Sequence, residues 1–222
     1  MAKSVGDIAN VRWTKMTWVE RTNCIMTHTR TNVSAEPFSN PHIRKILNRV
    51  INVVGWNIHP KPFIGVDPFA RECFTTKETT WITNDLNPEM NTTYNLEAKQ
   101  FSKMLLEQIG KSSIDLVLFD PPYSLRQLKD CYDGIGKDLE LWQTQNMWGE
   151  CKDDLAQMIK PGGYVVSFGW SSSGFGSHRG FQKKEIHLFE NGGREDRYDI
   201  IMVIERKVQT TLDSLFEGIE EE

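Results

Sequence analysis

An apolar run that stops at an acid and two prolines constrains this chain more than any other stretch. Residues 114–119 are rich in Ile, Leu and Val, which is typical of a strand buried on both faces of a parallel sheet. Asp120, Pro121 and Pro122 follow, and the strand must end there because proline cannot donate to a sheet ladder. Open α/β sheets bind their ligands at the carboxyl ends of their strands. The corner between Asp120 and Tyr123 is therefore a candidate site.

Two further stretches have the same layout, a short apolar strand that ends in a carboxylate. Residues 63–66 lead into Asp67, and residues 81–84 lead into Asp85. Segments with a helical pattern lie between the strands. Strand–helix alternation predicts right-handed βαβ units in a parallel sheet, so these acids and Asp120 are expected along one edge of it. The pattern predicts an α/β fold.

The tetrapeptide Asp120-Pro121-Pro122-Tyr123 resembles the catalytic signature of the S-adenosylmethionine-dependent amino-methyltransferases, most of all the DNA adenine-N6 enzymes. The resemblance is to the phage-type, minimal form that has no separate target-recognition domain. It covers residues 39–207 and implies an α/β, Rossmann-like methyltransferase fold with a mostly parallel seven-stranded sheet. Residues 183–189 and 198–205 are expected to form the antiparallel C-terminal hairpin of that sheet.

The resemblance also implies a role for each residue of the signature. Asp120 and the Pro121 carbonyl would accept hydrogen bonds from an exocyclic amino group, and Tyr123 would stack on the ring that carries it. Such stacking is worth about 1–3 kcal/mol per base. The target base would be flipped out of the duplex to reach these groups. The expected catalytic residues are Asp120, Pro121, Pro122 and Tyr123.

A second part of the resemblance concerns the cofactor, S-adenosyl-L-methionine. Asp85 would bind its ribose hydroxyls, and Glu97 would lie at its adenine amino group. The family has a glycine-rich turn where this chain continues with Arg71-Glu72-Cys73, and that departure implies an altered cofactor loop. The expected cofactor-binding residues are Asp67, Pro68, Phe69, Ala70, Asp85, Leu86, Glu97 and Asp120.

A long connection follows the catalytic corner. Residues 124–150 greatly exceed the about two to six residues usual for such a connection, which predicts a target-binding loop or lid. The segment carries bases and aromatic side chains that could contact an extruded base and its backbone, together with several acids. The expected substrate-binding residues are Tyr123, Arg126, Lys129 and Trp148.

Composition and charge are those of a soluble globular protein. The 222 residues are 39% hydrophobic and 25% charged, with a formal net charge of −4. Five acids among the last ten residues carry more than that charge, and the rest of the chain is at +1, which neither requires nor excludes nucleic acid. We expect an N-terminal arm at 1–38, the methyltransferase domain at 39–207 and an acidic tail at 208–222. The four cysteines lie far apart without a Cys-x-x-Cys, so no metal site is expected.

The sequence pattern favours neither a membrane span nor an export signal. No apolar run approaches the about 18 residues that would suggest a transmembrane helix. The first residues lack the apolar core of a signal peptide. We therefore expect no membrane association and a cytoplasmic location, in the host cytoplasm if the chain is phage-encoded.

The sequence thus predicts methyl transfer to the N6 amino group of adenine in DNA, with RNA as a less favoured partner. Cytosine N4 and guanine N2 in RNA are alternative targets, because Asp at position 120 favours adenine only weakly. A non-catalytic methyltransferase-fold binding subunit is the alternative from another class, and the missing glycine turn supports it. We expect no separate recognition domain, because neither the stretch between Phe101 and Asp120 nor the residues after 207 offer room for one. Specificity would be short, or would come from a separate partner or a homodimer.

Overall fold

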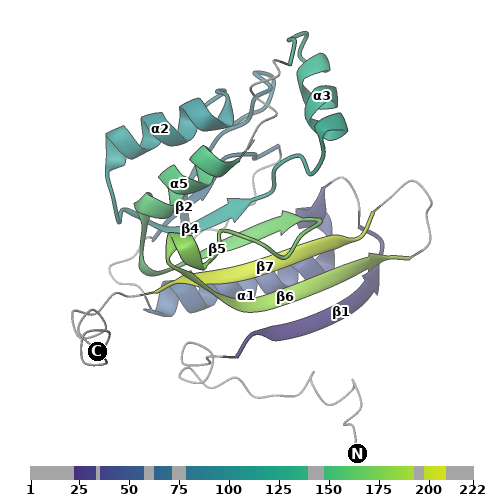
Figure 1. Ribbon diagram of the computed structural model, residues 1–222, viewed down its shortest axis with the longest axis vertical. Coiled ribbons are helices and arrows are strands. Elements are labelled where there is room, and N and C mark those ends of the chain that lie inside the picture. The colour runs from purple at the N-terminus through teal and green to yellow at the C-terminus, as the bar shows by residue number, and fades with distance from the viewer. Residues whose placement is uncertain are drawn as a thin grey trace, which may run out of the picture.

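The protein is built around one mixed sheet with helices on both faces, as the computed structural model in Figure 1 shows. The structure describes residues 23–33, 36–57, 63–71, 79–139, 148–192 and 198–208. Its strands are β1 Ile25–Thr31, β2 Phe63–Asp67, β3 Thr79–Thr83, β4 Ile114–Phe119, β5 Ile159–Gly169, β6 Phe181–Asn191 and β7 Ile200–Lys207. Its helices are α1 Pro41–Asn57, α2 Ala98–Ile109, α3 Leu125–Asp133 and α5 Gly149–Met158, with short 3-10 turns at Pro37–Ser39 and Ser177–Arg179.

The strand order confirms the predicted fold class. The order is β1-β6-β7-β5-β4-β2-β3, and β7 alone runs antiparallel to its two neighbours, β5 and β6. The pairings β1–β6, β2–β3, β2–β4 and β4–β5 are parallel. This is the mostly parallel, seven-stranded, Rossmann-like methyltransferase sheet that we expected, with β6 and β7 as its C-terminal hairpin.

Strand β1, at one side of the sheet, comes from the segment that we expected to be an N-terminal arm. Strand β1 pairs in parallel with β6, in a register that runs from Ile25 opposite Glu185 to Thr31 opposite Asn191. Its side chains alternate between partly buried and exposed, as is usual for an edge strand with one covered face. Residues 1–22 of the arm lie outside the described ranges.

Helix α1 covers one face of the sheet. The Asn40 side chain caps its first turn, where Oδ1 accepts a hydrogen bond from the His42 backbone N–H at 2.9 Å. Ile43, Leu47 and Val50 recur at helical spacing on the buried stripe. They pack in one core with sheet residues that include Phe63, Leu116, Leu118, Val166 and Met202.

Helices α2 and α5 cover the other face (Figure 1). Phe101 of α2 and Leu155 of α5 pack with Val66, Val117 and Val165 of the central strands. Every residue of β4 is buried, because helices lie over both of its faces. None of the helices in the described ranges is both long and apolar enough to cross a membrane.

A buried acid ties the three central strands together. Asp115 of β4 is fully buried, and its Oδ2 accepts a hydrogen bond from the Ile64 backbone N–H of β2 at 2.8 Å. Its Oδ1 accepts from the Lys160 ammonium of β5 at 2.7 Å. Because these bonds cross from β4 to both neighbours, they fix the stagger of the strands whose carboxyl ends carry the predicted site.

The segment after the predicted catalytic corner begins with a helix, where we expected a loop. Helix α3 occupies Leu125–Asp133, near the start of the 124–150 insertion, because Ser124 caps it through a hydrogen bond from the Gln127 N–H to its Oγ at 3.2 Å. The spacing Ser124-x-x-Gln127 is a capping-box signature, so the sequence contained a signal for this helix. Residues 140–147 of the insertion and 209–222 of the acidic tail lie outside the described ranges.

Candidate functional site

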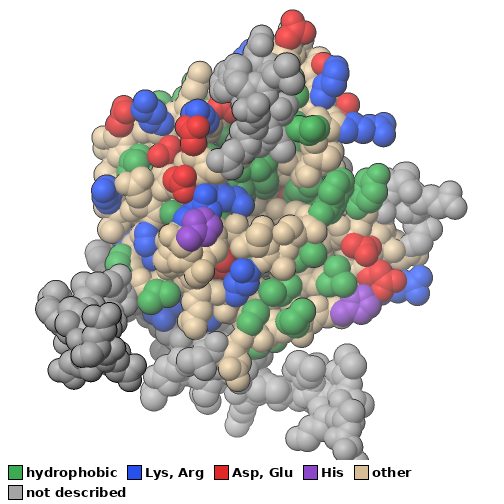
Figure 2. All heavy atoms as spheres, in the orientation of Figure 1, with side chains coloured by type: hydrophobic (Ala, Val, Ile, Leu, Met, Phe, Trp, Pro, Cys, Tyr) green, Lys and Arg blue, Asp and Glu red, His purple; other side chains and the backbone are tan. Residues whose placement is uncertain are grey.

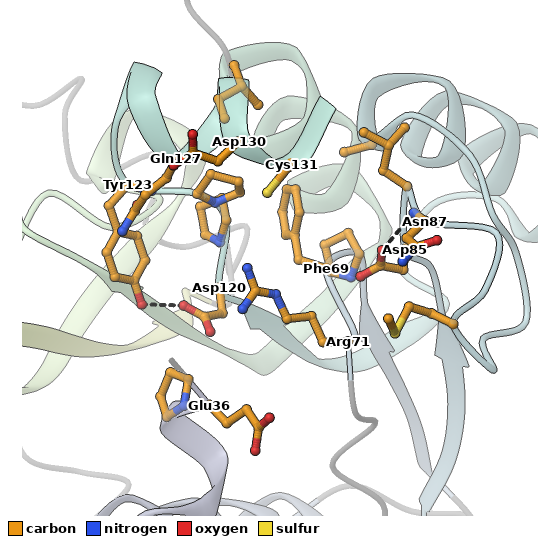
Figure 3. A pocket seen from close by; sticks show the side chains of 18 of the residues that line it. Glu36, Phe69, Arg71, Asp85, Asn87, Asp120, Tyr123, Gln127, Asp130 and Cys131 are labelled. Atoms are coloured by element: carbon orange, nitrogen blue, oxygen red, sulfur yellow. Dashed lines mark hydrogen bonds between the residues drawn. The ribbon is translucent and has the colours of Figure 1, made fainter. Parts of the chain in front are cut away.

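The main cavity of the described chain opens at the carboxyl ends of β2, β3 and β4, and Figure 3 shows it from close by. Its volume is about 870 Å³, in the range of cofactor and substrate pockets. The predicted residues in its wall are Pro68, Phe69, Asp85, Leu86, Glu97, Asp120, Pro121, Pro122, Tyr123 and Trp148. The fold therefore brings together most of the residues predicted from two separate parts of the resemblance.

The predicted catalytic corner, from Asp120 to Tyr123, is held by a hydrogen bond within it. The Tyr123 hydroxyl donates to Oδ1 of Asp120, as the dashed line in Figure 3 marks. The backbone N–H of Tyr123 donates to Oε1 of Gln127 at 2.6 Å. Gln127 thus connects the first turn of α3 to the corner, a positioning role that we did not predict although its capping-box spacing was visible.

Desolvation changes the ionisation of both groups in the corner. Burial raises the pKa of Asp120 to about 6, although the hydrogen bond from Tyr123 and the charge of Arg71 oppose the rise. Burial also raises the pKa of Tyr123, and the neighbouring Asp120 charge adds to that effect. Tyr123 therefore stays protonated and remains a hydrogen-bond donor, while Asp120 changes charge in the range where most enzymes work.

Asp67 is the most deeply buried acid of the site. It ends β2, is 1% exposed, and accepts a hydrogen bond at Oδ1 from the Phe69 N–H at 3.0 Å. Its other oxygen, Oδ2, is buried with no hydrogen-bond partner among the described residues. Burial raises its pKa to about 8, and the charges of Asp120 and Asp85 act in the same direction. Asp67 and Ala70 are buried and are not part of the cavity wall.

Asp85 and Glu97 both line the cavity and both also stabilise backbone. Asp85 accepts a hydrogen bond from the Asn87 N–H at 2.8 Å, and burial raises its pKa. Glu97 caps α2, where Oε2 accepts from the Lys99 N–H at 2.8 Å. The helix cap occupies part of the hydrogen-bonding capacity of Glu97, and a carboxylate retains acceptor sites for a ligand.

A buried asparagine joins the loops that follow β2 and β3. The Asn84 amide nitrogen donates to the carbonyls of Pro68 at 3.1 Å and Leu96 at 3.0 Å, and its Oδ1 accepts from the Leu96 N–H at 2.9 Å. Its backbone also bonds to Asp67 and Ala70. Asn84 thus holds the Asp67 turn and the approach to Glu97 at fixed positions beside the cavity.

Arg71 brings a positive charge to the site that we did not predict. It stands where the resembling family continues with glycine, and it lines the cavity. Its guanidinium extends towards the Asp120 carboxylate in Figure 3, and its charge lowers the pKa values of both Asp120 and Asp85. Glu72 and Cys73, the other residues of the altered turn, lie outside the described ranges.

Two of the predicted substrate residues lie away from the main cavity. Lys129 is on the exposed side of α3, where its ammonium pairs with Asp133 at 2.5 Å. Arg126 lines a second cavity of about 380 Å³, together with the aromatic residues Trp170 and Tyr198. Trp148, by contrast, lies in the main wall, edge-on to Phe69 at 4.9 Å between ring centroids.

Trp170 and Tyr198 are site residues that sequence reasoning missed. Trp170 follows the end of β5, and Tyr198 precedes the start of β7. Because β7 is antiparallel to β5, its first residue lies at the edge where β5 ends. An aromatic residue next to each of these strand ends was the available signal, and it has this meaning only once the direction of β7 is known.

Acids dominate the cavity, but they are not arranged as metal ligands. No group of three or more His, Cys, Asp or Glu side chains that could hold a metal ion occurs in the part of the chain that the structure describes. The site is instead a set of separated acids with Arg71 among them. Such a site suits an organic ligand that carries both positive and negative groups.

No protein-family model and no curated protein matches this chain. Among solved structures, the chain is similar to the 1,6-didemethyltoxoflavin-N1-methyltransferase of Burkholderia thailandensis, crystallised with 1,6-didemethyltoxoflavin and S-adenosylhomocysteine. The identity is 10% and the TM-score 0.49, over 79% of this chain and 82% of that one.

Two further solved structures are similar at the same level. The N-methyltransferase NodS of Bradyrhizobium japonicum, in complex with S-adenosyl-L-homocysteine, is 12% identical with a TM-score of 0.43, over 79% of this chain and 94% of that one. TrmN from Thermus thermophilus is 14% identical with a TM-score of 0.41, over 72% of this chain. The chain spans 48% of the TrmN chain, about half of its length.

Proposed function

We propose that this protein transfers a methyl group from S-adenosyl-L-methionine to the exocyclic N6 amino group of adenine in DNA. One observation carries the proposal: the Asp120-Pro121-Pro122-Tyr123 corner lies in the wall of the same cavity as Asp85 and Glu97, next to buried Asp67. An amino-group acceptor and a set of cofactor-binding acids therefore share one pocket. The sequence had suggested the acceptor and the cofactor-binding acids from two separate stretches.

The charges around the cavity fit this cofactor. Its amino-acid part has an ammonium and a carboxylate, and its sulfonium is a second cation. Asp67 lies buried behind the wall, and its Oδ2 has no hydrogen-bond partner among the described residues. In this proposal the ammonium group reaches that oxygen, and its positive charge lowers the raised pKa of Asp67 and favours the ionised carboxylate. The Arg71 guanidinium extends towards Asp120 in the cavity wall, and guanidinium groups bind carboxylates in bidentate geometry. Asp85 and Glu97 would accept from the ribose hydroxyls and the adenine amino group.

The residues of the corner would prepare the target amine. When bound, S-adenosylmethionine supplies a methyl group on a sulfonium, whose sulfur keeps the bonding electron pair as the methyl leaves. Asp120 and the Pro121 carbonyl accept the two amino N–H groups, which orients the nitrogen lone pair. A carboxylate has about four acceptor sites, so the hydrogen bond from Tyr123 leaves Asp120 with capacity for the amine.

The same carboxylate can receive the proton that the reaction releases. A nitrogen that has gained a methyl group must lose one of its protons, and Asp120 lies at hydrogen-bonding distance from that nitrogen in this proposal. With its pKa raised to about 6 by burial, Asp120 is ionised at neutral pH and is a better base than an ordinary carboxylate. Positioning and proton transfer are therefore the contributions of the chain itself.

The proposal is tested by methyl transfer from labelled S-adenosylmethionine to unmethylated duplex DNA, single-stranded DNA and RNA. Products are digested to nucleosides and identified by mass spectrometry. N6-methyladenine from DNA is the expected result, whereas N4-methylcytosine or N2-methylguanine would replace the proposed target. Cofactor bound without transfer to any of these would favour the alternative of a binding subunit.

A pair of variants separates chemistry from binding. Asp120→Ala should abolish transfer and change cofactor affinity little, because Asp67, Asp85 and Glu97 remain. Asp133→Ala is the matched control, since Asp133 is exposed on α3 and outside both cavity walls. Normal turnover by Asp120→Ala would contradict the proposed mechanism.

A further inference from the structure

The edge of the sheet that carries the site is divided into two chemically different halves. The strands β3, β2 and β4 end in acids, at Asp85, Asp67 and Asp120. The next strands, β5 and β7, have Trp170 and Tyr198 at the same edge. The acidic half is accounted for by the proposed cofactor and the target amine. The aromatic half has no role in that chemistry.

Trp170 and Tyr198 form a continuous aromatic path that starts at the catalytic corner. The ring of Trp170 lies 5.9 Å from the ring of Tyr123, and the ring of Tyr198 lies 4.8 Å from that of Trp170. The first pair is edge-to-face, with an interplanar angle of 65°, and the second is tilted at 57°, so neither pair is stacked face to face. The path therefore leads from the partly buried Tyr123 outwards to the surface.

The outer two rings are unusually open to solvent. Trp170 is 42% and Tyr198 66% exposed, and they are two of the five large hydrophobic residues that are exposed within the described ranges. In Figure 2 hydrophobic side chains gather at the surface where β5 ends and β7 begins, beneath α3. Isolated exposed hydrophobic residues are ordinary, but two aromatic rings in contact beside a catalytic corner indicate a binding surface.

The second cavity joins these rings to polar groups. It is lined by Ser124, Arg126, Gln127, Asp130, Trp170 and Tyr198. Gln127, Asp130, Trp170 and Tyr198 also line the main cavity, so the two cavities are neighbours that share these four residues. A purely apolar partner would leave the charged and amide groups here without partners, whereas a nucleotide offers a flat ring, hydrogen-bonding edges and a phosphate.

We infer that Trp170 and Tyr198 bind the base of the nucleotide adjacent to the target base. This inference rests on the proposed function, which places the target base on Tyr123. The planes of the Tyr123 and Trp170 rings are at 65°, so bases that lie on these two rings cannot be parallel to each other as stacked neighbours are. The two bases are therefore held unstacked in an opened strand, and Arg126 in the wall of the second cavity supplies a cation for the phosphate. The preferred substrate is a single-stranded or locally opened polynucleotide, and a free nucleoside is a poor one.

The test removes the Trp170 ring from the protein and the flanking base from the oligonucleotide, first separately and then together. Fluorescently labelled single-stranded oligonucleotides carry one adenine, flanked either by normal nucleotides or by abasic sites on the 5′ or 3′ side. Their binding to the wild type and to Trp170→Ala is measured by anisotropy in the presence of S-adenosylhomocysteine. Trp170→Ala should weaken binding of the normal strand about 5- to 150-fold. One abasic flank should weaken binding to the wild type by a similar factor and add little in Trp170→Ala.

Two further variants exclude a merely structural effect. Trp170→Phe keeps a stacking face and should recover most of the affinity, and Tyr198→Ala should reproduce part of the loss. Met26→Ala is the control, because Met26 is 75% exposed on the outermost strand β1 and lies in neither cavity wall. This variant should bind like the wild type. Independent effects of the abasic flank and Trp170→Ala, or no loss in Trp170→Ala, would overturn the inference, as would no binding of any strand.

The outcomes also separate this inference from the proposed function. Methyl transfer to DNA together with independent effects would retain the function and reject the flanking-base site. Coupled effects without any methyl transfer would retain the flanking-base site and reject the function. Equal transfer rates to adenosine and to an oligonucleotide would contradict the proposed substrate preference.

Discussion

The Tyr123 hydroxyl donates a hydrogen bond to the carboxylate of Asp120, three residues earlier in the chain. The two intervening prolines fix the backbone between them, so the acceptor of the site and its aromatic ring form a single rigid unit. Because the hydroxyl donates to the ionised carboxylate, it lowers the pKa of Asp120 against the larger effect of burial. Stacking and acid–base properties are therefore coupled through this one bond.

The first prediction concerns the acidic side of the pH–activity profile. Asp120 must be ionised to accept from the target amine, and burial raises its pKa to about 6. In the wild type, kcat/KM for the oligonucleotide should fall about tenfold per pH unit below this value. Tyr123→Phe keeps the ring and removes the donor, so the fall should begin at a higher pH. Steady-state rates from pH 5 to 9 measure both profiles.

The control for this prediction is Tyr94→Phe. The Tyr94 hydroxyl donates to Gln108 at 3.2 Å on the surface, away from both cavity walls. Its removal should leave the profile unchanged. A Tyr123→Phe profile that coincides with the wild type, or moves to lower pH, would show that the hydroxyl does not favour ionised Asp120.

The central fold could be predicted from the sequence because its signals are local. The all-buried strand β4 is a continuous apolar run, and the acids at three strand ends gather at one edge as soon as the strands are parallel. Strand β1 could not be placed, since it is half-exposed and its partner β6 lies about 160 residues later. Pairing across such a distance depends on the whole fold.

Candidate site residues could be predicted where they stand together in one short sequence motif. Asp120 and Tyr123 are in one tetrapeptide, and the wall of the cavity contains both. Arg71, Trp170 and Tyr198 reach the site from other elements, so their roles follow from strand order and direction. Lys129 was chosen for its charge alone, and its neighbour Asp133 engages it instead.

The second prediction concerns Asp67, whose replacement should stabilise the fold at high pH but weaken cofactor binding. Burial raises the pKa of Asp67 from 3.8 to about 8, so the folded chain binds this proton more tightly than the unfolded chain does. The resulting stabilisation is complete below pH about 4 and is lost as the pH rises through about 8. Asp67→Asn removes this dependence, and it should be more stable than the wild type at pH 9 by at least about 1.4 kcal/mol, the equivalent of one pKa unit.

Two measurements check this prediction. Urea unfolding at pH 5 and pH 9 should show that the difference between Asp67→Asn and the wild type grows with pH. Calorimetric titration with S-adenosylmethionine should show weaker binding by Asp67→Asn, because the partner for the ammonium group is lost. A variant that is less stable than the wild type at pH 9 would contradict the assigned pKa, and unchanged affinity would contradict the role in binding.

The third prediction concerns the guanidinium that replaces the glycine turn. If Arg71 binds the cofactor carboxylate, Arg71→Ala should weaken S-adenosylhomocysteine binding at least about tenfold, as expected for loss of a charge-assisted pair. Arg71→Lys should recover part of the affinity, because a point charge replaces the bidentate fork. Arg44→Ala is the matched control, since Arg44 also lines the cavity but comes from α1. Equal affinities of Arg71→Ala and Arg44→Ala would leave Arg71 without this role.

The last prediction tests whether the loops of the site are held together by one side chain. Asn84 is 1% exposed and makes three side-chain hydrogen bonds to the Pro68 and Leu96 backbones. Asn84→Ala leaves these buried groups without partners and should destabilise the fold by about 2–5 kcal/mol while weakening cofactor binding. Asn95→Ala is the control, because the Asn95 amide also donates three hydrogen bonds, to the carbonyls of Asn87 and Met90 and to the Thr92 hydroxyl, but at an exposed position where water replaces them. Urea unfolding and titration of both variants decide the matter: similar small losses would show that the loops keep their places without Asn84.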